Sequence, residues 1–150
     1  MKRDCASGYS AIELMIALAL ISILAAIAYP SFTSYTASFR VQVAGREAYS
    51  ALQEARQQAI TRGRRVRFLV VGADSYQLQW EDGAVWRTIR GPIRLEGGMQ
   101  LTSSGGTLTF LPRGTVSPLS TVTVTDPTSP EHSVVLTVPI TGLVRAHGGG

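Results

Sequence analysis

Glu13 is an acidic residue at a position where an acid is costly. It directly precedes an uninterrupted apolar run, Leu14–Tyr29, in which Ser22 is the only clearly polar residue. An ionised side chain inside a membrane segment costs about 2.5–3.5 kcal/mol at the helix centre, and less near its end. We therefore expect Glu13 to pair with a cation, whose identity would indicate the function. The alternative is that Glu13 lies at the level of the lipid headgroups and has no role of its own.

The other residues offer no catalytic or metal-binding pattern. The 150-residue chain has one cysteine, Cys5, and two isolated histidines, His132 and His147. A single cysteine excludes an intramolecular disulfide and a cysteine-based metal site. The motifs of serine hydrolases, zinc proteases and phosphate-binding loops do not occur in the sequence. The sequence predicts a protein that is not an enzyme and that requires neither a metal nor a cofactor.

The apolar run follows a short leader with a basic start, residues 1–8. The 16 residues of the apolar run are marginal for crossing a membrane, which takes about 20. An ordinary secretory signal peptide is one explanation, because Ala26-Ile27-Ala28 matches its cleavage pattern and would leave Tyr29 as the first mature residue. Glu13 argues against this explanation, since an acid is costly within the apolar region of a signal peptide.

The leader and the apolar run together form a more specific pattern. It comprises a glycine, an aromatic residue, an acid four residues further on and an immediate apolar helix. The residues that carry it are Gly8, Tyr9, Ser10, Ile12, Glu13, Leu14 and Met15, followed after the apolar run by Pro30, Phe32 and Tyr35. This pattern resembles a type IV prepilin. The resemblance implies that a prepilin peptidase cleaves between Gly8 and Tyr9 and then methylates the new amine of Tyr9, a position that is Phe in most family members.

The resemblance also supplies a partner for Glu13. The mature amine of Tyr9 would be positive and buried, and a buried charge must be paired. Glu13 lies four residues from Tyr9, one helical turn away on the same face. In the family, this acid neutralises the amine of a neighbouring subunit, so Glu13 is expected to set the register of filament assembly. Pro30 is expected to kink the helix or to break its hydrogen bonding locally.

Apolar residues continue beyond Pro30 at three- and four-residue spacing. This spacing predicts a helix from about Ala11 to about Arg62 that ends at Gly63. Some 50 residues correspond to a rod of about 75 Å. The stripe expected to pack on a globular head consists of Phe32, Tyr35, Phe39, Val43, Tyr49, Leu52, Ala55, Ala59 and Ile60.

The remainder of the chain alternates between apolar and polar residues, with β-branched residues and glycine-rich connections, which is typical of strands. The expected strands are Val66–Val71, Tyr76–Trp80, Ala84–Ile89, Thr107–Leu111, Thr121–Thr125 and Val134–Val138, with Leu143–Ala146 closing the sheet. Asp82-Gly83 predicts a hairpin turn. The predicted fold is α+β and pilin-like, with a long N-terminal helix packed on an antiparallel, β-rich head. Its expected segments are the cleaved leader 1–8, the transmembrane and assembly helix 9–29, its amphipathic half 30–62, the head 63–147 and a disordered tail 148–150.

Several elements of the head are similar to those of the GspH/FimT family. They are Leu52, Ala55-Arg56, Ala59-Ile60, Arg62-Gly63, Val66, Trp80, Gly83, the run from Thr109 to Gly114, and Gly142 to Arg145. The resemblance implies a minor pilin or pseudopilin of a type IV pilus or of type II secretion, which helps to initiate or cap a filament. It implies other pilin subunits, prepilin peptidase, an inner-membrane assembly platform and membrane lipid as partners. The chain would cross the inner membrane once, with its head in the periplasm or on the filament at the cell surface.

DNA is the alternative partner. Some family members that take up DNA carry a C-terminal Gly-Arg-x-Arg element, which corresponds here to Gly142-Leu143-Val144-Arg145. Arg145 matches this element, whereas Leu143 replaces its first arginine. Four further arginines, Arg62, Arg64, Arg65 and Arg67, could contact phosphate, although charged residues beside a strand also serve to block edge pairing. We favour a solvated or subunit-contacting surface for these four.

Overall fold

The computed structural model describes residues 10–149, except for the side chains of residues 28–34 and 149. The leader, Gly8, Tyr9 and Gly150 therefore lie outside the described residues. The chain forms two compact units, Met1–Thr36 and Ala37–Gly150, and we call the second the head unit. Helix α1, Ala11–Arg62, has residues in both units.

In the first unit, α1 begins directly after Ser10, whose carbonyl oxygen accepts hydrogen bonds from the backbone amides of Glu13 and Leu14 at 3.0 and 3.2 Å. Ser22 does not interrupt the helix, because its hydroxyl donates to the carbonyl oxygen of Leu18 at 2.8 Å. That bond satisfies a polar group that an apolar surrounding would otherwise penalise. In the part of the chain that the structure describes, no helix combines the length and the apolar character that crossing a membrane requires.

The C-terminal end of α1 confirms the predicted boundary. Gly63 has a φ of 62°, a conformation that glycine adopts without steric cost. The amide of Gly63 bonds to the carbonyl of Ile60, and the amide of Arg64 bonds to that of Ala59, both at 3.3 Å. These two bonds form a Schellman cap, which satisfies the last carbonyls of the helix and redirects the chain into the first strand.

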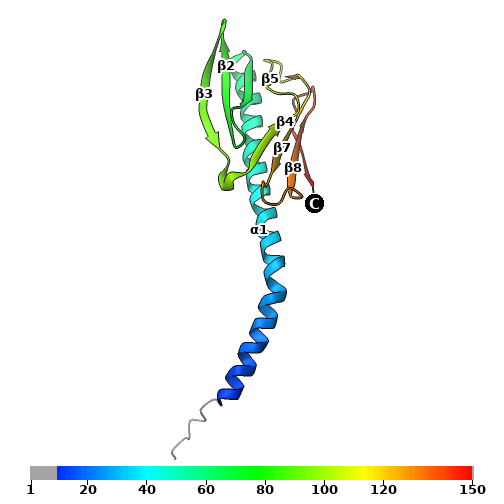
Figure 1. The fold of residues 1–150 in the computed structure, drawn as a ribbon. Coiled ribbons are helices and arrows are strands. Elements are labelled where there is room, and N and C mark those ends of the chain that lie inside the picture. Colours follow the sequence, from blue (N-terminus) through cyan, green and yellow to red (C-terminus); the bar gives the residue numbers. More distant parts are fainter. Residues whose placement is uncertain (1–9, 150) are drawn as a thin grey trace, which may run out of the picture. The chain divides into compact units, whose positions relative to one another are not determined.

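The head unit packs its part of α1 against two antiparallel sheets (Figure 1). The first sheet has the order β3-β2-β1-β5-β6, and the second has the order β4-β7-β8-β9. Their strands are β1 (Val66–Val70), β2 (Ser75–Asp82), β3 (Val85–Arg94), β4 (Gln100–Ser103), β5 (Leu108–Phe110), β6 (Val116–Ser117), β7 (Ser120–Thr125), β8 (Ser133–Val138) and β9 (Arg145–Gly149), with a short 3-10 helix at Glu96–Gly98. The predicted α+β fold is confirmed.

Most predicted strands occur close to their predicted positions, and the Asp82-Gly83 turn joins β2 to β3. The prediction missed β4 and β6, and β3 runs five residues further than expected, to Arg94. The last strand was expected at Leu143–Ala146. The structure instead places β9 at Arg145–Gly149, so Gly148 and Gly149 lie in a strand where the sequence suggested a disordered tail.

The helix face that packs on the sheets is only partly the predicted one. Leu52, Ala55 and Ala59 are buried as expected, but Phe39, Val43, Tyr49 and Ile60 are exposed. Tyr35 belongs to the first unit, and the side chain of Phe32 lies outside those described. The buried face instead carries Ala37, Val41, Ala44, Ala48 and Ala51. Small residues are required there because helix and sheet approach closely, and a Cβ added at Gly45 would lie 2.8 Å from a methyl group of Val134. The prediction was wrong in part, because the three- and four-residue spacing of apolar residues included large side chains that are exposed and left out the alanines of the buried face.

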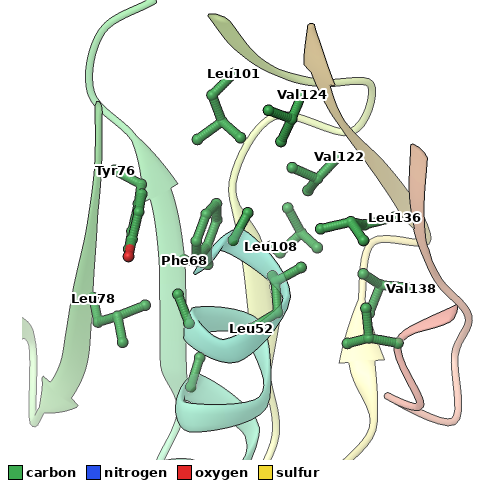
Figure 2. Close-up of a cluster of buried hydrophobic side chains, with 14 of the residues drawn as sticks. Leu52, Phe68, Tyr76, Leu78, Leu101, Leu108, Val122, Val124, Leu136 and Val138 are labelled. Atoms are coloured by element: carbon green, nitrogen blue, oxygen red, sulfur yellow. The ribbon is translucent and has the colours of Figure 1, made fainter. Parts of the chain in front are cut away.

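Side chains from the helix and from both sheets share one hydrophobic core (Figure 2). Leu52 lies between Phe68, Tyr76 and Leu78 of the first sheet and Val122, Leu136 and Val138 of the second. The rings of Phe68 and Tyr76 stack with their centroids 5.0 Å apart. The core fixes the register of β1 and β2, and this register determines where the arginines that follow α1 lie.

Candidate functional site

Glu13 lies in the first turn of α1, and its side chain is exposed. A carboxylate in the first turn is favoured by the partial positive charge at a helix N-terminus, by about 0.3–1 kcal/mol. The predicted cleavage site between Gly8 and Tyr9, and the predicted methylated amine of Tyr9, lie outside the described residues. The pairing of Glu13 with this amine therefore stays a prediction.

Pro30 lies within the span of α1. Proline lacks the backbone N–H that would otherwise bond to the carbonyl four residues earlier, which is that of Ala26. The side chain of Pro30 is not among those described, so the expected kink stays a prediction as well.

The four arginines that follow one another in sequence do not form a single patch. Val66 and Phe68 are buried, so the alternation of β1 places Arg67 on the opposite, outer face of the first sheet. Arg65 shares that face, whereas Arg62 and Arg64 lie beside Trp80, which pairs with Val66 on the inner face. The sequence-predicted cluster is thus divided between the two faces of the sheet.

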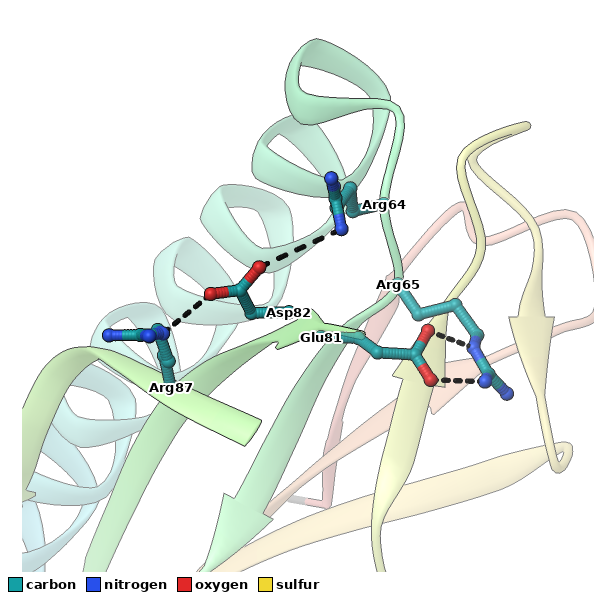
Figure 3. Close-up of polar contacts among 5 residues, drawn as sticks. All are labelled: Arg64, Arg65, Glu81, Asp82 and Arg87. Carbon is teal, nitrogen blue, oxygen red and sulfur yellow. Dashed lines mark hydrogen bonds and ion pairs between the residues drawn. The ribbon is translucent and has the colours of Figure 1, made fainter. Parts of the chain in front are cut away.

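Acidic residues of β2 hold two of these arginines (Figure 3). Arg65 and Glu81 form a two-pronged pair, in which Nε of Arg65 donates to Oε2 of Glu81 at 2.5 Å. The hydrogen bonds and charge of Glu81 raise the pKa of Arg65 above its usual range. Asp82 lies between Arg87, at 2.6 Å, and Arg64, at 3.8 Å. A phosphate group would have to compete with these carboxylates for the same donors.

Tryptophans of β2 and β3 also contact three of these arginines through their rings. The guanidinium carbons of Arg62 and Arg64 lie 5.2 and 5.8 Å from the ring centre of Trp80. Arg67 lies 4.3 Å from the ring centre of Trp86, and its Nε donates to Gln79 at 2.7 Å. These are cation–π distances, so the arginines and tryptophans stabilise one another. The arrangement fits a rigid surface with fixed positive charges.

Arg145 lies apart from the other four arginines. It is exposed on β9 and pairs in register with Thr137 of β8, so it belongs to the second sheet. Its neighbour Leu143 is exposed as well, with 52% of its surface accessible. The structure therefore does not bring Arg145 together with Arg62, Arg64, Arg65 and Arg67.

The sequence analysis missed the role of Arg56. Its half-buried guanidinium donates from Nε to the carbonyl oxygen of Gly114 at 3.0 Å. Gly142 packs directly on that carbonyl, and a Cβ at Gly142 would overlap the oxygen. Gly114 and Gly142 have φ values of 79° and 71°, which favour glycine. The family-like elements that contain these glycines gave the only sequence signal for this three-residue contact.

A further polar contact joins α1 to β2 and β3. The hydroxyl of Tyr76 donates to Glu47 at 3.4 Å, and Arg90 contacts Glu54 at 3.2 Å. Burial, followed by the charge and the hydrogen bond of Glu47, raises the pKa of Tyr76 to about 12. Among residues 10–149, no group of three or more His, Cys, Asp or Glu side chains is arranged to hold a metal ion.

A long N-terminal helix, a first-turn acid and two antiparallel sheets on the helix define a pilin-like class of protein. Comparison with protein families agrees. Residues 44–142 match the type II transport protein GspH model, and residues 5–29 match the prokaryotic N-terminal methylation motif. The chain belongs to the GspH family. This membership, rather than the lack of a catalytic pattern, supports the prediction that the protein is not an enzyme.

Solved structures show the same fold. The minor pseudopilin EpsH of the type II secretion system of Vibrio cholerae superposes with a TM-score of 0.63 at 18% identity, over 74% of this chain and 98% of that one. The type IV minor pilin FimU of Pseudomonas aeruginosa gives 0.63 at 17% identity, over 75% and 92%. Two curated fimbrial proteins of Pseudomonas aeruginosa are 48% identical over 59 residues. That match spans 39% of this chain and 38% of theirs.

Proposed function

We propose that this chain is a low-abundance subunit that helps to initiate or cap a type II secretion pseudopilus or a type IV pilus. The observation that carries the proposal is the co-occurrence in one chain of the GspH match and the N-terminal methylation motif. Structural neighbours from both kinds of system share the fold, so fold alone does not favour either system.

In this proposal, prepilin peptidase removes residues 1–8 and methylates Tyr9. The apolar run Leu14–Tyr29 holds the protein in the inner membrane as a single pass, and the head unit lies in the periplasm or on the filament. The assembly platform then moves the subunit into the filament, where the carboxylate of Glu13 neutralises a buried amine. An unpaired amine in apolar surroundings would be penalised, so the pair selects the correct register.

The intact mass and N-terminal sequence of the protein isolated from membranes test this proposal. We expect a chain that begins at N-methylated Tyr9. A chain that begins at Tyr29 would show cleavage by an ordinary signal peptidase and would overturn the filament proposal. The two products differ by 20 residues, so a single mass spectrum distinguishes them.

DNA capture during uptake is the second candidate function. The observation in its favour is the exposed Arg145, for which no ion pair is found among the described residues, in a chain of net charge +4. The engagement of Arg64, Arg65 and Arg67 by acids and tryptophans weakens it. Salt-dependent DNA binding by the full chain in detergent micelles, lost in Arg145→Gln, would support this function. Binding that neither salt nor this substitution changes would contradict it.

A further inference from the structure

The outer edge of β9 differs from the three other sheet edges of the head unit. β3 contains Pro92 and two register shifts, and its arginines Arg87, Arg90 and Arg94 are each paired with an acid. β6 has two residues. β4 is partly covered, because the amide of Leu101 donates to the carbonyl of Ala73 at 2.6 Å. Proline, irregularity, charge, short length and cover are the usual means by which sheet edges avoid pairing with another strand.

At β9 only one of these means is present, the exposed charge of Arg145 at the start of the strand. Its residues pair in regular register with β8 and have no strand on the other side within the described part of the chain (Figure 1). Arg145 to Gly148 are all exposed. Two of the strand's five residues are glycines, which present backbone hydrogen-bonding groups without a side chain to obstruct them. The edge therefore offers alternate N–H and C=O groups to an additional strand.

A groove lies beside this edge, on the side that faces α1. Ala146 and Gly148 pair with Leu136 and Val134, whose side chains point into the core, so these two small residues also face inward. Because they do not fill the space to the helix, they leave a groove of about 360 Å³. Val134 and Gly45 line it together with Tyr49 and Arg46 of α1.

The charges around the groove indicate what it accepts. Its lining is predominantly apolar and contains one cation, Arg46, and no carboxylate. Arg46 is exposed, and no ion pair of its side chain is found among residues 10–149. An occupant that completes this groove thus combines an apolar side chain with a carboxylate, and the free edge requires it to be extended.

We infer that β9 binds an extended segment of another subunit, which adds as a strand to its outer edge. One inward side chain of that segment is apolar and enters the groove between Ala146 and Tyr49. A carboxylate two residues further on has the same orientation and reaches Arg46. This inference deepens the proposed function, because it names the kind of segment by which a neighbouring subunit is held.

A synthetic peptide tests the inference with the full mature chain in detergent micelles. The probe is Lys-Thr-Val-Thr-Asp-Thr-Val-Lys, in which the valines and the aspartate share one face, and the matched peptide carries asparagine in place of aspartate. We expect the aspartate peptide to bind and to slow amide hydrogen exchange of residues 145–149. The asparagine peptide should bind about fivefold more weakly, as for the loss of one exposed charge pair.

Two variants of the chain distinguish the contribution of the apolar groove to peptide binding from that of the charge of Arg46. Ala146→Leu fills the groove with an apolar side chain and should weaken peptide binding about tenfold or more. Arg46→Gln should abolish the preference for aspartate over asparagine. Arg87→Gln, an equivalent change at the edge of β3, should leave binding unchanged. Circular dichroism of each variant verifies that its fold is retained.

Three results would overturn the inference. The first is that millimolar peptide fails to slow exchange in β9, and the second is that Ala146→Leu binds as well as the original chain. The third is that an alanine-rich helical peptide with one aspartate binds while the extended peptide does not, which would indicate a helix as the occupant. These three results do not bear on the proposed function, which is tested by the mature N-terminus. A chain that begins at Tyr9 supports the proposed function and a chain that begins at Tyr29 contradicts it, whatever the peptide does.

Discussion

Two charged residues of the head unit, Arg56 and Glu81, each hold another part of the chain through hydrogen bonds. Arg56 reaches 58 positions along the chain to the carbonyl of Gly114, and Glu81 fixes Arg65. Glu13 differs, because its proposed partner is the amine of a processed N-terminus. Substitutions at these positions should therefore affect different properties of the protein, namely folding for Arg56 and assembly for Glu13.

Replacing Glu13 should separate processing from assembly. In Glu13→Ala, the proposed cleavage site between Gly8 and Tyr9 is unchanged, so we expect normal removal of the leader. We expect little of the variant in filaments, since a buried amine would be left without a partner. Immunoblots of sheared filaments and of membranes measure both quantities. Glu54→Gln, which removes an acid elsewhere on α1, is the control, and normal incorporation of Glu13→Ala would contradict the charge-pairing proposal.

Replacing Arg56 should loosen the head unit. Arg56→Ala leaves the carbonyl of Gly114 without its donor, which we expect to lower the free energy of unfolding by about 1–3 kcal/mol. Denaturant unfolding of the full chain in micelles measures the change. Arg56→Lys keeps a charged donor and should recover part of the loss. Unchanged stability in Arg56→Ala would show that solvent replaces this hydrogen bond at no cost.

At the scale of elements, the helix is placed by its small residues. Alanines on the buried face allow α1 to approach both sheets, while larger residues such as Phe39 remain 58% exposed. The stripe predicted from the spacing of apolar residues therefore includes exposed positions and omits part of the buried face. The same close approach explains why the exposed aromatic residues of α1 are available for contacts outside the head unit.

The observed buried face of α1 predicts a large loss of stability for one substitution and almost none for another. Ala48→Leu adds three carbons to a fully buried position, and we expect overpacking to cost about 1–3 kcal/mol of stability. Phe39→Ser removes a large apolar side chain from an exposed position and should change stability by less than about 0.5 kcal/mol. Urea unfolding of both variants measures these changes. If the predicted stripe were the buried face, Phe39→Ser would cost more stability than Ala48→Leu.

Local patterns predicted the elements that depend on local signals. Gly63 predicted the end of α1, and alternation predicted β1, β2, β7 and β8. β6 was missed because it has two residues, and β4 because Gln100–Ser103 carries little apolar alternation. The division into two sheets rests on pairings between distant residues, which no local pattern encodes. The arginine cluster divided for the same reason, because the core position of Val66 decides where Arg65 and Arg67 point.

At the scale of the whole molecule, pH should act on the stability of the head unit through Tyr76. Its pKa is raised to about 12 in the folded state, from the ordinary value of 10.0. Between these values the unfolded chain loses a proton that the folded chain retains, so stability falls as pH rises from about 10 to about 12. Below pH 10 both states are protonated, and Tyr76 contributes no pH dependence.

Unfolding measurements at pH 9, 10 and 11, each value taken at about constant ionic strength, check this expectation. We expect Tyr76→Phe to lose less stability over this range than the original chain, because phenylalanine has no proton to release. Equal slopes for the two proteins would show that other groups cause the alkaline loss of stability.

The contact between Gly114 and Gly142 has a consequence for protein engineering. The loop that follows β5 and the loop that precedes β9 rest on one another and on Arg56, with no room for a side chain between them. A chimera that takes residues 139–144 from a related subunit must therefore also take residues 111–115 and keep Arg56. The surface that carries Ile140 and Leu143 is exchangeable between relatives as a two-loop cassette, whereas either loop transplanted alone would meet a mismatched neighbour.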